Sequence, residues 1–178
     1  ASANEQADTQ TLSIGGNMKE VALTHGQVVT VDDEDHERVS QFKWRAQWYS
    51  YEGYFVPLRE QDRYGDRKII LLSRFIMNAP SGLDVDHKNH NHMDCTRVNL
   101  RVCTRAENLA NQIKQRRSCS SRFKGVSWLK HIKRWMAYIT KDWQRIYLGV
   151  FKNEEDAAYV YDTNARKLFG AFAYLNFS

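Results

Sequence analysis

The chain has 178 residues, a formal net charge of +5, 42% hydrophobic residues and 26% charged residues. This composition excludes an intrinsically disordered chain, and the length allows one or two domains with modest cores. No apolar run approaches the ~20 residues of a membrane span, and the chain does not start like a signal peptide. We therefore expect an intracellular, cytoplasmic protein with no membrane partner.

Positive charge is concentrated in the second half of the chain, above all between residues 114 and 134. A basic half indicates a polyanionic partner, although composition alone does not distinguish such a face from an ordinary solvated one. The three cysteines form no C-x-x-C pair and predict no disulfide framework, which is typical of a reducing compartment.

The first part of the chain predicts a flexible arm and then a small β-rich region. Residues 1–17 are small and polar and predict the arm. Short β-branched runs at 21–23 and 28–31 flank a turn signal. The acids at 32–35 predict the start of a helix that continues to about Phe42, because negative charge stabilises a helix N-terminus. A metal role for these acids is the weaker interpretation.

The stretch 42–54 is dense in aromatic residues. We interpret it as a sheet that buries alternate rings, although rings between basic residues can also stack on nucleic acid. A strand at 54–58, a polar turn at 60–66, and a strand passing into a short helix at 68–77 follow.

The most informative stretch runs from residue 83 to residue 112. Asp86 and His87 end a short strand, and residues 88–98 form a loop before a second strand at 99–103. The pattern Thr104-x-x-Glu107 is a capping box, so it predicts a helix that begins there and runs to about residue 115. A helix packed across this hairpin can aim Asn108 at Asp86.

These residue types suit phosphodiester hydrolysis. A histidine that titrates near neutrality can take a proton from an attacking water. A hard divalent cation held by carboxylate and amide oxygens can stabilise the departing oxygen, with waters and phosphate completing its coordination.

Asp86-His87, Asn99-Leu100-Arg101 and Asn108 resemble the HNH (ββα-metal) homing endonucleases of phages and introns. The resemblance implies His87 as general base, Asp86 and Asn108 as metal ligands, and Asn99 as a catalytic-site asparagine that braces the loop through backbone hydrogen bonds. It implies a divalent cation, Mg²⁺ or Mn²⁺, and double-stranded DNA as the partner. The loop differs from the common pattern, with His90 in place of a Gly and Cys95 in place of an Asn.

A zinc cluster of His87, His90, His92 and Cys95 is the alternative metal site. Structural zinc is usually held by two closely spaced ligand pairs. The only other cysteines are distant in the sequence, so we disfavour this alternative.

Residues 115–122 are basic and Ser-rich and predict a linker. The segment 123–178 then predicts three strands, a helix opened by Asn153 and acids, and a tail from 173 to 177 that docks back on the core. Helical spacing places Ala157, Ala158, Tyr161, Ala165 and Leu168 toward the sheet, and Gly170 ends the helix.

This segment closely resembles the plant ethylene-response-factor (APETALA-type) DNA-binding domain. The resemblance rests on Gly125-Val126, Trp135-x-Ala137, Leu148-Gly149-x-Phe151, Ala157-Ala158-x-x-Tyr161-Asp162 and Leu175-Asn176-Phe177. It implies that the sheet enters the major groove while the helix supports it from behind. With the linker arginines included, the DNA-binding set is Arg116, Arg117, Arg122, Lys124, Ser127, Lys133, Arg134, Tyr138, Thr140, Arg145 and Tyr147. Several of these differ from the plant residues, so the plant target sequence does not transfer.

We therefore predict an α+β protein: a flexible arm (1–17), an N-terminal sheet plus HNH unit (18–114), a basic linker (115–122) and a three-stranded sheet on one helix (123–178). The predicted function is a metal-dependent homing-type DNA endonuclease from a mobile element. The alternative is a DNA-binding regulator or architectural protein with an inactive HNH unit. One site per chain nicks DNA, so a double-strand break needs a homodimer or two successive nicks.

Overall fold

The structure is a computed structural model that describes residues 17–50, 53–63, 65–114 and 119–177. Residues 1–16 of the predicted arm (1–17) and residues 115–118 of the predicted linker (115–122) lie outside this description. The α+β class is confirmed. In chain order the elements are β1 (Met18–Ala22), η1 (Thr24–Gly26), β2 (Val28–Asp32), α1 (Asp33–Ser40), β3 (Arg45–Tyr49), β4 (Tyr54–Arg63), β5 (Asp66–Leu71), α2 (Leu72–Met77), β6 (Asp84–His87), β7 (Leu100–Cys103), α3 (Arg105–Asn111), β8 (Val126–Leu129), β9 (Arg134–Lys141), β10 (Gln144–Phe151), α4 (Glu154–Phe169) and η2 (Gly170–Phe172).

The N-terminal region is built from two small antiparallel sheets. β1 pairs with β2, and β4 lies between β3 and β5. Strands β4 and β5 pair as far as Arg63 and Asp66, so the polar stretch at 60–66 is mostly strand and not the predicted turn. Helix α1 ends at Ser40, two residues before the predicted end.

One hydrophobic core joins this region to the central hairpin. Buried valines of β2 and α1 pack with Trp44, the apolar side chains of α2, and Leu100 of β7. The prediction that alternate rings of 42–54 are buried is wrong in part: Trp44 is buried, but Trp48 is 47% exposed. The Trp48 ring packs instead against Phe55 of the neighbouring strand β4, with the ring centroids 4.8 Å apart.

The central unit is the hairpin β6–β7 with helix α3, a ββα arrangement. The capping box is confirmed: the Thr104 side chain accepts from the Glu107 amide, and the Glu107 carboxylate accepts from the Thr104 amide. The helix ends at Asn111 and not near 115, because Gln112 has an extended ψ of 135°.

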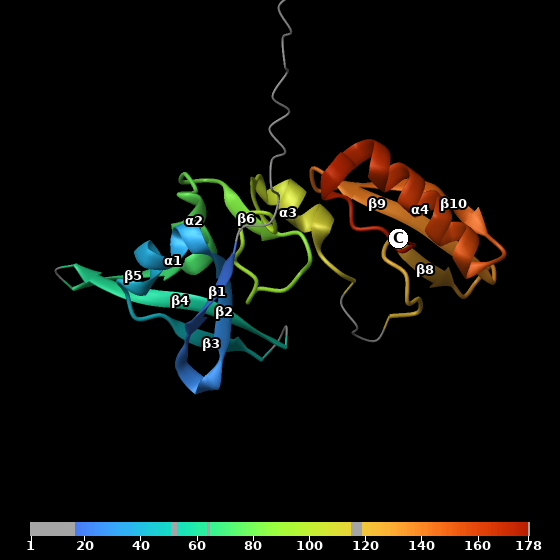
Figure 1. The fold of residues 1–178 in the computed structure, drawn as a ribbon. Helices are drawn as coiled ribbons and strands as arrows, with labels where there is room; N and C mark the ends of the chain where they lie inside the picture. The colour runs from blue at the N-terminus through green and yellow to red at the C-terminus, as the bar shows by residue number, and fades with distance from the viewer. Residues whose placement is uncertain (1–16, 51–52, 64, 115–118, 178) are drawn as a thin grey trace, which may run out of the picture.

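The C-terminal unit is a sheet in the order β10-β9-β8, covered on one face by α4. The expected core residues of α4 are buried or half-buried beneath it, and Gly170 caps the helix with a φ of +53°. The tail docks on the same core through Leu175 and Phe177. Figure 1 shows this unit beside α3, on the far side of the hairpin from the N-terminal sheets. No helix in the described ranges is long and apolar enough to cross a membrane.

Candidate active site

Asp86 and His87 lie at the end of β6, where the chain leaves the hairpin for its loop. In the antiparallel register Asp86 opposes Arg101 and His87 opposes Leu100. Both side chains are buried, with 5% of Asp86 and 6% of His87 exposed. A buried carboxylate needs partners, because an uncompensated charge in the interior is costly.

Asp86 obtains those partners from β7 and α3. The Arg101 Nε donates to Asp86 Oδ2 at 2.8 Å, and Arg101 Nη2 lies 2.6 Å from the same oxygen. The Asn111 side-chain amide donates to Asp86 Oδ1 at 2.9 Å and also to the His87 carbonyl at 3.3 Å. The Asn111 nitrogen also lies 3.0 Å from Oδ2, so this oxygen is shared by Arg101 and the helix, whereas Oδ1 faces the helix alone.

The structure does not pair Asn108 with Asp86 as expected. The Asn108 amide donates to Asp84 Oδ2 at 2.9 Å, and Asp84 also pairs with Arg105 at 3.2 Å. The hydrogen bond from Asn108 is the first cause of a lowered Asp84 pKa. Residues i and i+3 share one helix face, and residues i and i+2 share one strand face, so two parallel Asp–Asn pairs form.

Asn111 is thus a contact of Asp86 and His87 that is absent from the predicted set of site residues. The signal that could have found it is its spacing: Asn108 and Asn111 match Asp84 and Asp86 pair by pair. The sequence alone does not settle the register of α3 on β6, which decides which amide meets which acid.

Asn99 braces the loop between the two strands. Its side-chain oxygen accepts from the Asn89 amide at 3.0 Å, and its side-chain nitrogen donates to the Asp94 carbonyl at 2.7 Å. One side chain therefore holds both arms of the loop. His90, at the position where the family pattern has Gly, has a φ of +62°, a left-handed conformation that glycine adopts without strain.

His87 is packed among loop side chains. Its Nε2 lies 3.9 Å from the Cys95 sulfur, and its ring meets His92 edge-on at 4.7 Å, while His92 stacks on Tyr54 at 4.1 Å. Burial, with a smaller contribution from the charge of His92, lowers the pKa of His87 to about 4. The expectation that this histidine titrates near neutrality is therefore wrong for the structure as it stands: His87 is neutral near pH 7 and a weaker base than a free imidazole.

The N-terminal region holds the outer side of this loop. The backbone of Thr30 in β2 donates to the Met93 carbonyl and accepts from the Cys95 amide. Arg97 binds the buried Asp35 carboxylate through two nitrogens, at 2.7 and 2.9 Å. The acids expected to start α1 therefore also anchor the loop between β6 and β7.

The described residues contain no group of three or more His, Cys, Asp or Glu side chains arranged to hold a metal ion. A cation at this site would take one carboxylate, from Asp86, and amide oxygen from α3. Such a sparse set of hard oxygen ligands fits Mg²⁺, which keeps several waters and is completed by substrate phosphate. In this structure the Asp86 carboxylate is bound by Arg101 and by the Asn111 amide nitrogen, so a cation would have to share Asp86 with these groups.

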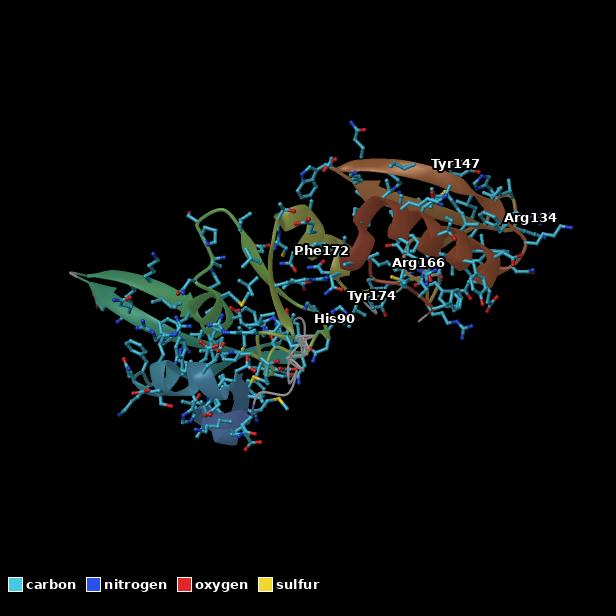
Figure 2. The ribbon with its side chains drawn as sticks, turned by 45° about the horizontal axis from the view of Figure 1, so that its top comes forward. His90, Arg134, Tyr147, Arg166, Phe172 and Tyr174 are labelled. Carbon is cyan, nitrogen blue, oxygen red and sulfur yellow. The ribbon has the colours of Figure 1, made fainter. Side chains whose placement is uncertain are left out.

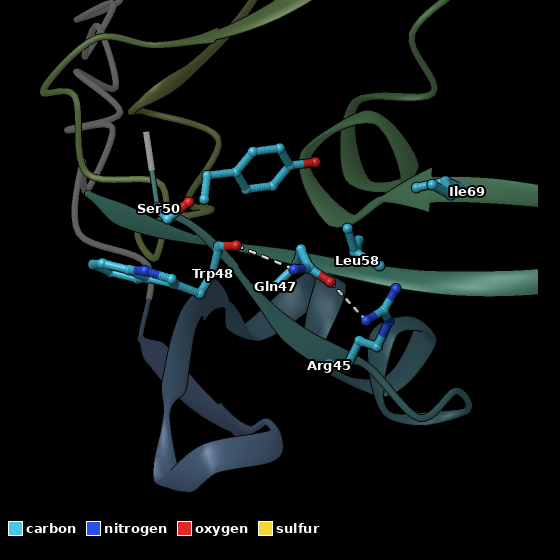
Figure 3. Close-up of a pocket in the computed structure, with 7 residues that line it drawn as sticks. Arg45, Gln47, Trp48, Ser50, Leu58 and Ile69 are labelled. Atoms are coloured by element: carbon cyan, nitrogen blue, oxygen red, sulfur yellow. Dashed lines mark hydrogen bonds between the residues drawn. The ribbon is translucent and has the colours of Figure 1, made fainter. Parts of the chain in front are cut away.

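A cavity of about 370 Å³ lies away from this site, on one face of β3–β5. Figure 3 shows its wall, with Gln47 joined by hydrogen bonds to Arg45 and to the Trp48 carbonyl. None of its lining residues carries a carboxylate or a cysteine. The cavity contributes no part of the candidate active site.

The C-terminal sheet carries most of the expected DNA-binding side chains on one face. The register pairs Arg145 with Thr140 and Tyr147 with Tyr138, and it places Ser127 beside Met136 and Arg134 beside Leu129. These alternate with the side chains that pack on α4, so they share the uncovered face. Arg145 lies over the Tyr138 ring at 4.2 Å, and Tyr147 is 61% exposed. Figure 2 shows Arg134 and Tyr147 far from His90.

Two expected DNA-binding residues, Lys124 and Arg122, do not lie on the uncovered face. Lys124 points its amine at backbone carbonyls of α3, and Arg122 pairs with Glu155 at 2.9 Å beside the start of α4. Arg116 and Arg117 lie outside the described residues. Lys133 lies in the β8–β9 turn with a φ of +52° and is exposed, next to the uncovered face.

A ββα unit with an acid–histidine pair on its hairpin and amides on its helix is the arrangement of HNH-type nucleases. The family model for HNH endonucleases matches residues 78–110, which contain the hairpin, its loop and most of α3. The chain is also 32% identical over 141 residues to an uncharacterized HNH endonuclease of Acanthamoeba polyphaga mimivirus, covering 76% of this chain and 67% of that protein. The chain belongs to the HNH endonuclease family. Membership of this family indicates a nuclease and implies a DNA substrate. HNH nucleases generally use a divalent metal.

Proposed function

We propose that the protein is a homing-type DNA endonuclease that hydrolyses phosphodiester bonds in the ββα unit and selects its DNA with the C-terminal sheet. The observation that carries the proposal is the convergence of Asp86 and His87 from β6 with side-chain amides from α3, inside a loop braced from both sides. Burying a carboxylate and an imidazole next to each other costs desolvation free energy. A contribution to stability alone therefore does not explain the pair.

His87 is the general base in this proposal. Its lowered pKa keeps it neutral, and the contacts with Cys95 and His92 fix the position of its ring. His87 takes the proton of the attacking water, and the products are a 5′-phosphate and a 3′-hydroxyl. A divalent cation, Mg²⁺ or Mn²⁺, supplies charge stabilisation at the phosphate.

The ligands proposed for the cation are Asp86 and an amide oxygen of α3. The family resemblance assigns the amide to Asn108, whereas Asn111 is the asparagine whose side chain contacts Asp86; its nitrogen faces the carboxylate, so its oxygen would have to turn toward a bound cation. The two asparagines form a matched pair of variants, because each belongs to the same helix and donates to one aspartate.

The uncovered face of β8–β10 is the proposed reader of DNA sequence. A three-stranded sheet can enter the major groove, and this face combines cations with tyrosines and small polar groups. The face carries Ser127, Arg134, Tyr138, Thr140, Arg145 and Tyr147, with Lys133 at its edge.

The test is conversion of supercoiled plasmid to nicked and linear forms with Mg²⁺ or Mn²⁺. We expect cleavage by the wild type, none with a chelator, and loss of at least about 100-fold in rate for His87→Ala, the usual size of a general-base contribution. Binding to the plasmid should survive this change. Equal rates for wild type and His87→Ala would favour the alternative, a DNA-binding regulator with an inactive HNH unit.

Comparison of Asn108→Ala with Asn111→Ala identifies the amide ligand. The ligand variant should require a higher Mg²⁺ concentration for half-maximal rate, whereas the other should change stability alone. The ratio of nicked to linear product at early times distinguishes successive nicking from concerted cleavage by a dimer.

A further inference from the structure

The C-terminal unit is joined to the nuclease unit by a reciprocal pair of lysines. The Lys124 amine, from the C-terminal unit, donates to the Ala110 and Gln112 carbonyls at 2.7 Å each. The Lys114 amine, just past α3, donates in the opposite direction to the Phe123 carbonyl at 2.6 Å and the Val126 carbonyl at 3.2 Å. Each lysine therefore satisfies backbone acceptors of the other unit.

The tail of the C-terminal unit makes a second set of contacts. The Tyr174 amide donates to the Ala110 carbonyl at 3.1 Å. Arg101, which holds Asp86, donates to the Ala171 carbonyl at 2.6 Å, and its guanidinium lies 4.0 Å from the Phe172 ring centroid. Figure 2 shows Phe172 and Tyr174 between the two units, with His90 facing Tyr174. We call these two sets of contacts the dock.

The dock is expected to hold. The carbonyls at the end of a helix have no partner within the helix, and the Lys124 ammonium group satisfies two of them at the end of α3, one of which, Ala110, also accepts from the Tyr174 amide. Several weak contacts between units that are already tethered act as intramolecular contacts, at high effective concentration. The dock also reaches from the end of α3 to the arginine that binds Asp86.

We propose that the dock fixes the distance along DNA between the bases read by the β8–β10 face and the phosphodiester cut at Asp86–His87. Lys114 and Lys124 are then specificity-determining residues, which set the position of the cut without touching a base. The connector between the units, residues 115–118, does not set this distance. The inference rests on the proposed function, because it needs both a cutting site and a reading face.

The test compares where the protein binds with where it cuts. Full-length protein is incubated with long linear DNA and Mg²⁺, the cut ends are sequenced, and the C-terminal unit is footprinted on the same DNA in Ca²⁺. The measured quantity is the offset between footprint and cut over many sites. We expect one offset for the wild type, unchanged when a Gly-Ser-Gly-Ser insertion lengthens the connector after residue 116.

The decisive variant is Lys114→Met with Lys124→Met, which keeps the aliphatic side chains and removes the donors. We expect its cuts to spread over several nucleotides around the wild-type offset. The matched control is Lys130→Met with Lys133→Met, two exposed lysines of the same unit. The control should bind DNA several-fold more weakly and keep the single offset.

Three results would overturn the inference: a scattered offset for the wild type, an offset that grows with the inserted length, or a single offset in the Lys114/Lys124 variant. If urea titrations show that the Lys114/Lys124 variant does not fold, the Gly-Ser-Gly-Ser insertion variant alone tests the inference. If the wild type cuts no DNA, both the proposed function and this inference are wrong. If it cuts DNA at variable offsets from the footprint, only this inference is wrong.

Discussion

Arg101 supports a buried carboxylate, so its removal has a large predicted cost. The Asp86 side chain is 6% exposed and the Arg101 side chain 14% exposed, and two arginine nitrogens bind Asp86 Oδ2. Removing one partner of a buried pair typically costs about 3–5 kcal/mol, because the other charge remains buried and uncompensated. Arg101→Gln also loses the donor to the Ala171 carbonyl. We expect the free energy of unfolding to fall by about 3–5 kcal/mol.

Urea titration in the presence of a chelator measures this loss. With an m value of about 2 kcal/mol/M, the unfolding midpoint moves down by roughly 2 M. Arg105→Gln is the matched control, because Arg105 pairs with the neighbouring Asp84 but is 66% exposed. An exposed pair contributes about 1 kcal/mol or less. Equal effects for the two variants, or a loss below about 0.5 kcal/mol for Arg101→Gln, would refute the argument from burial.

Mg²⁺ provides a second measurement on the same variants. In the wild type a cation must share Asp86 with the positive charge of Arg101, whereas in Arg101→Gln the carboxylate lacks that competitor. Since a ligand that binds only the folded state stabilises it, Mg²⁺ should raise the unfolding midpoint of Arg101→Gln more than that of the wild type. Asp86→Asn with Arg101→Gln should be insensitive to Mg²⁺, and sensitivity there would place the cation elsewhere.

The remaining predictions concern three local features. Thr104→Ala removes the capping box of α3 and should lower the free energy of unfolding by about 0.5–2 kcal/mol in urea titrations, while Thr104→Ser should cost less. Gly125→Ala should unfold the C-terminal unit, because a Cβ there would lie 2.0 Å from the Tyr161 ring and φ is +73°; near-native circular dichroism would contradict this. Iodoacetamide at pH 8 should modify the exposed Cys119 and spare Cys95. Cys95 is fully buried, and its burial raises the pKa of its thiol to about 12. Peptide mass mapping identifies the modified cysteine.

Local patterns in the sequence predicted the elements of the site well. The capping box places the start of α3 within a residue, because a cap is a contact between neighbours in sequence. The alternation in β9 and β10 separates the face that packs on α4 from the uncovered face, because strand side chains alternate strictly. The role of Asn99 as a brace of the loop follows the family resemblance and fits its two backbone contacts.

Contacts between elements were harder to predict, since they depend on how one element slides over another. A shift of one turn along α3 exchanges Asn108 with Asn111 as the partner of Asp86, and no local pattern sets that shift. Likewise, the acids at 32–35 predict a helix start, but the ion pair of Asp35 with Arg97 joins residues 62 positions apart. The end of α3 was also predicted too late, because polar residues continue beyond it without a Gly or Pro signal.

Lys124 shows why charge in a sequence does not identify its partner. An ammonium group is satisfied as well by the free carbonyls at a helix C-terminus as by a phosphate, and the structure places Lys124 at the end of α3. Salt dependence separates the two partners, because each phosphate contact contributes about 0.9 to the slope of log K against log salt on double-stranded DNA. Arg145→Met should therefore flatten the slope by about 1, whereas Lys124→Met should leave it unchanged. If both changes flatten the slope equally, Lys124 contacts a phosphate of the DNA and the argument is wrong.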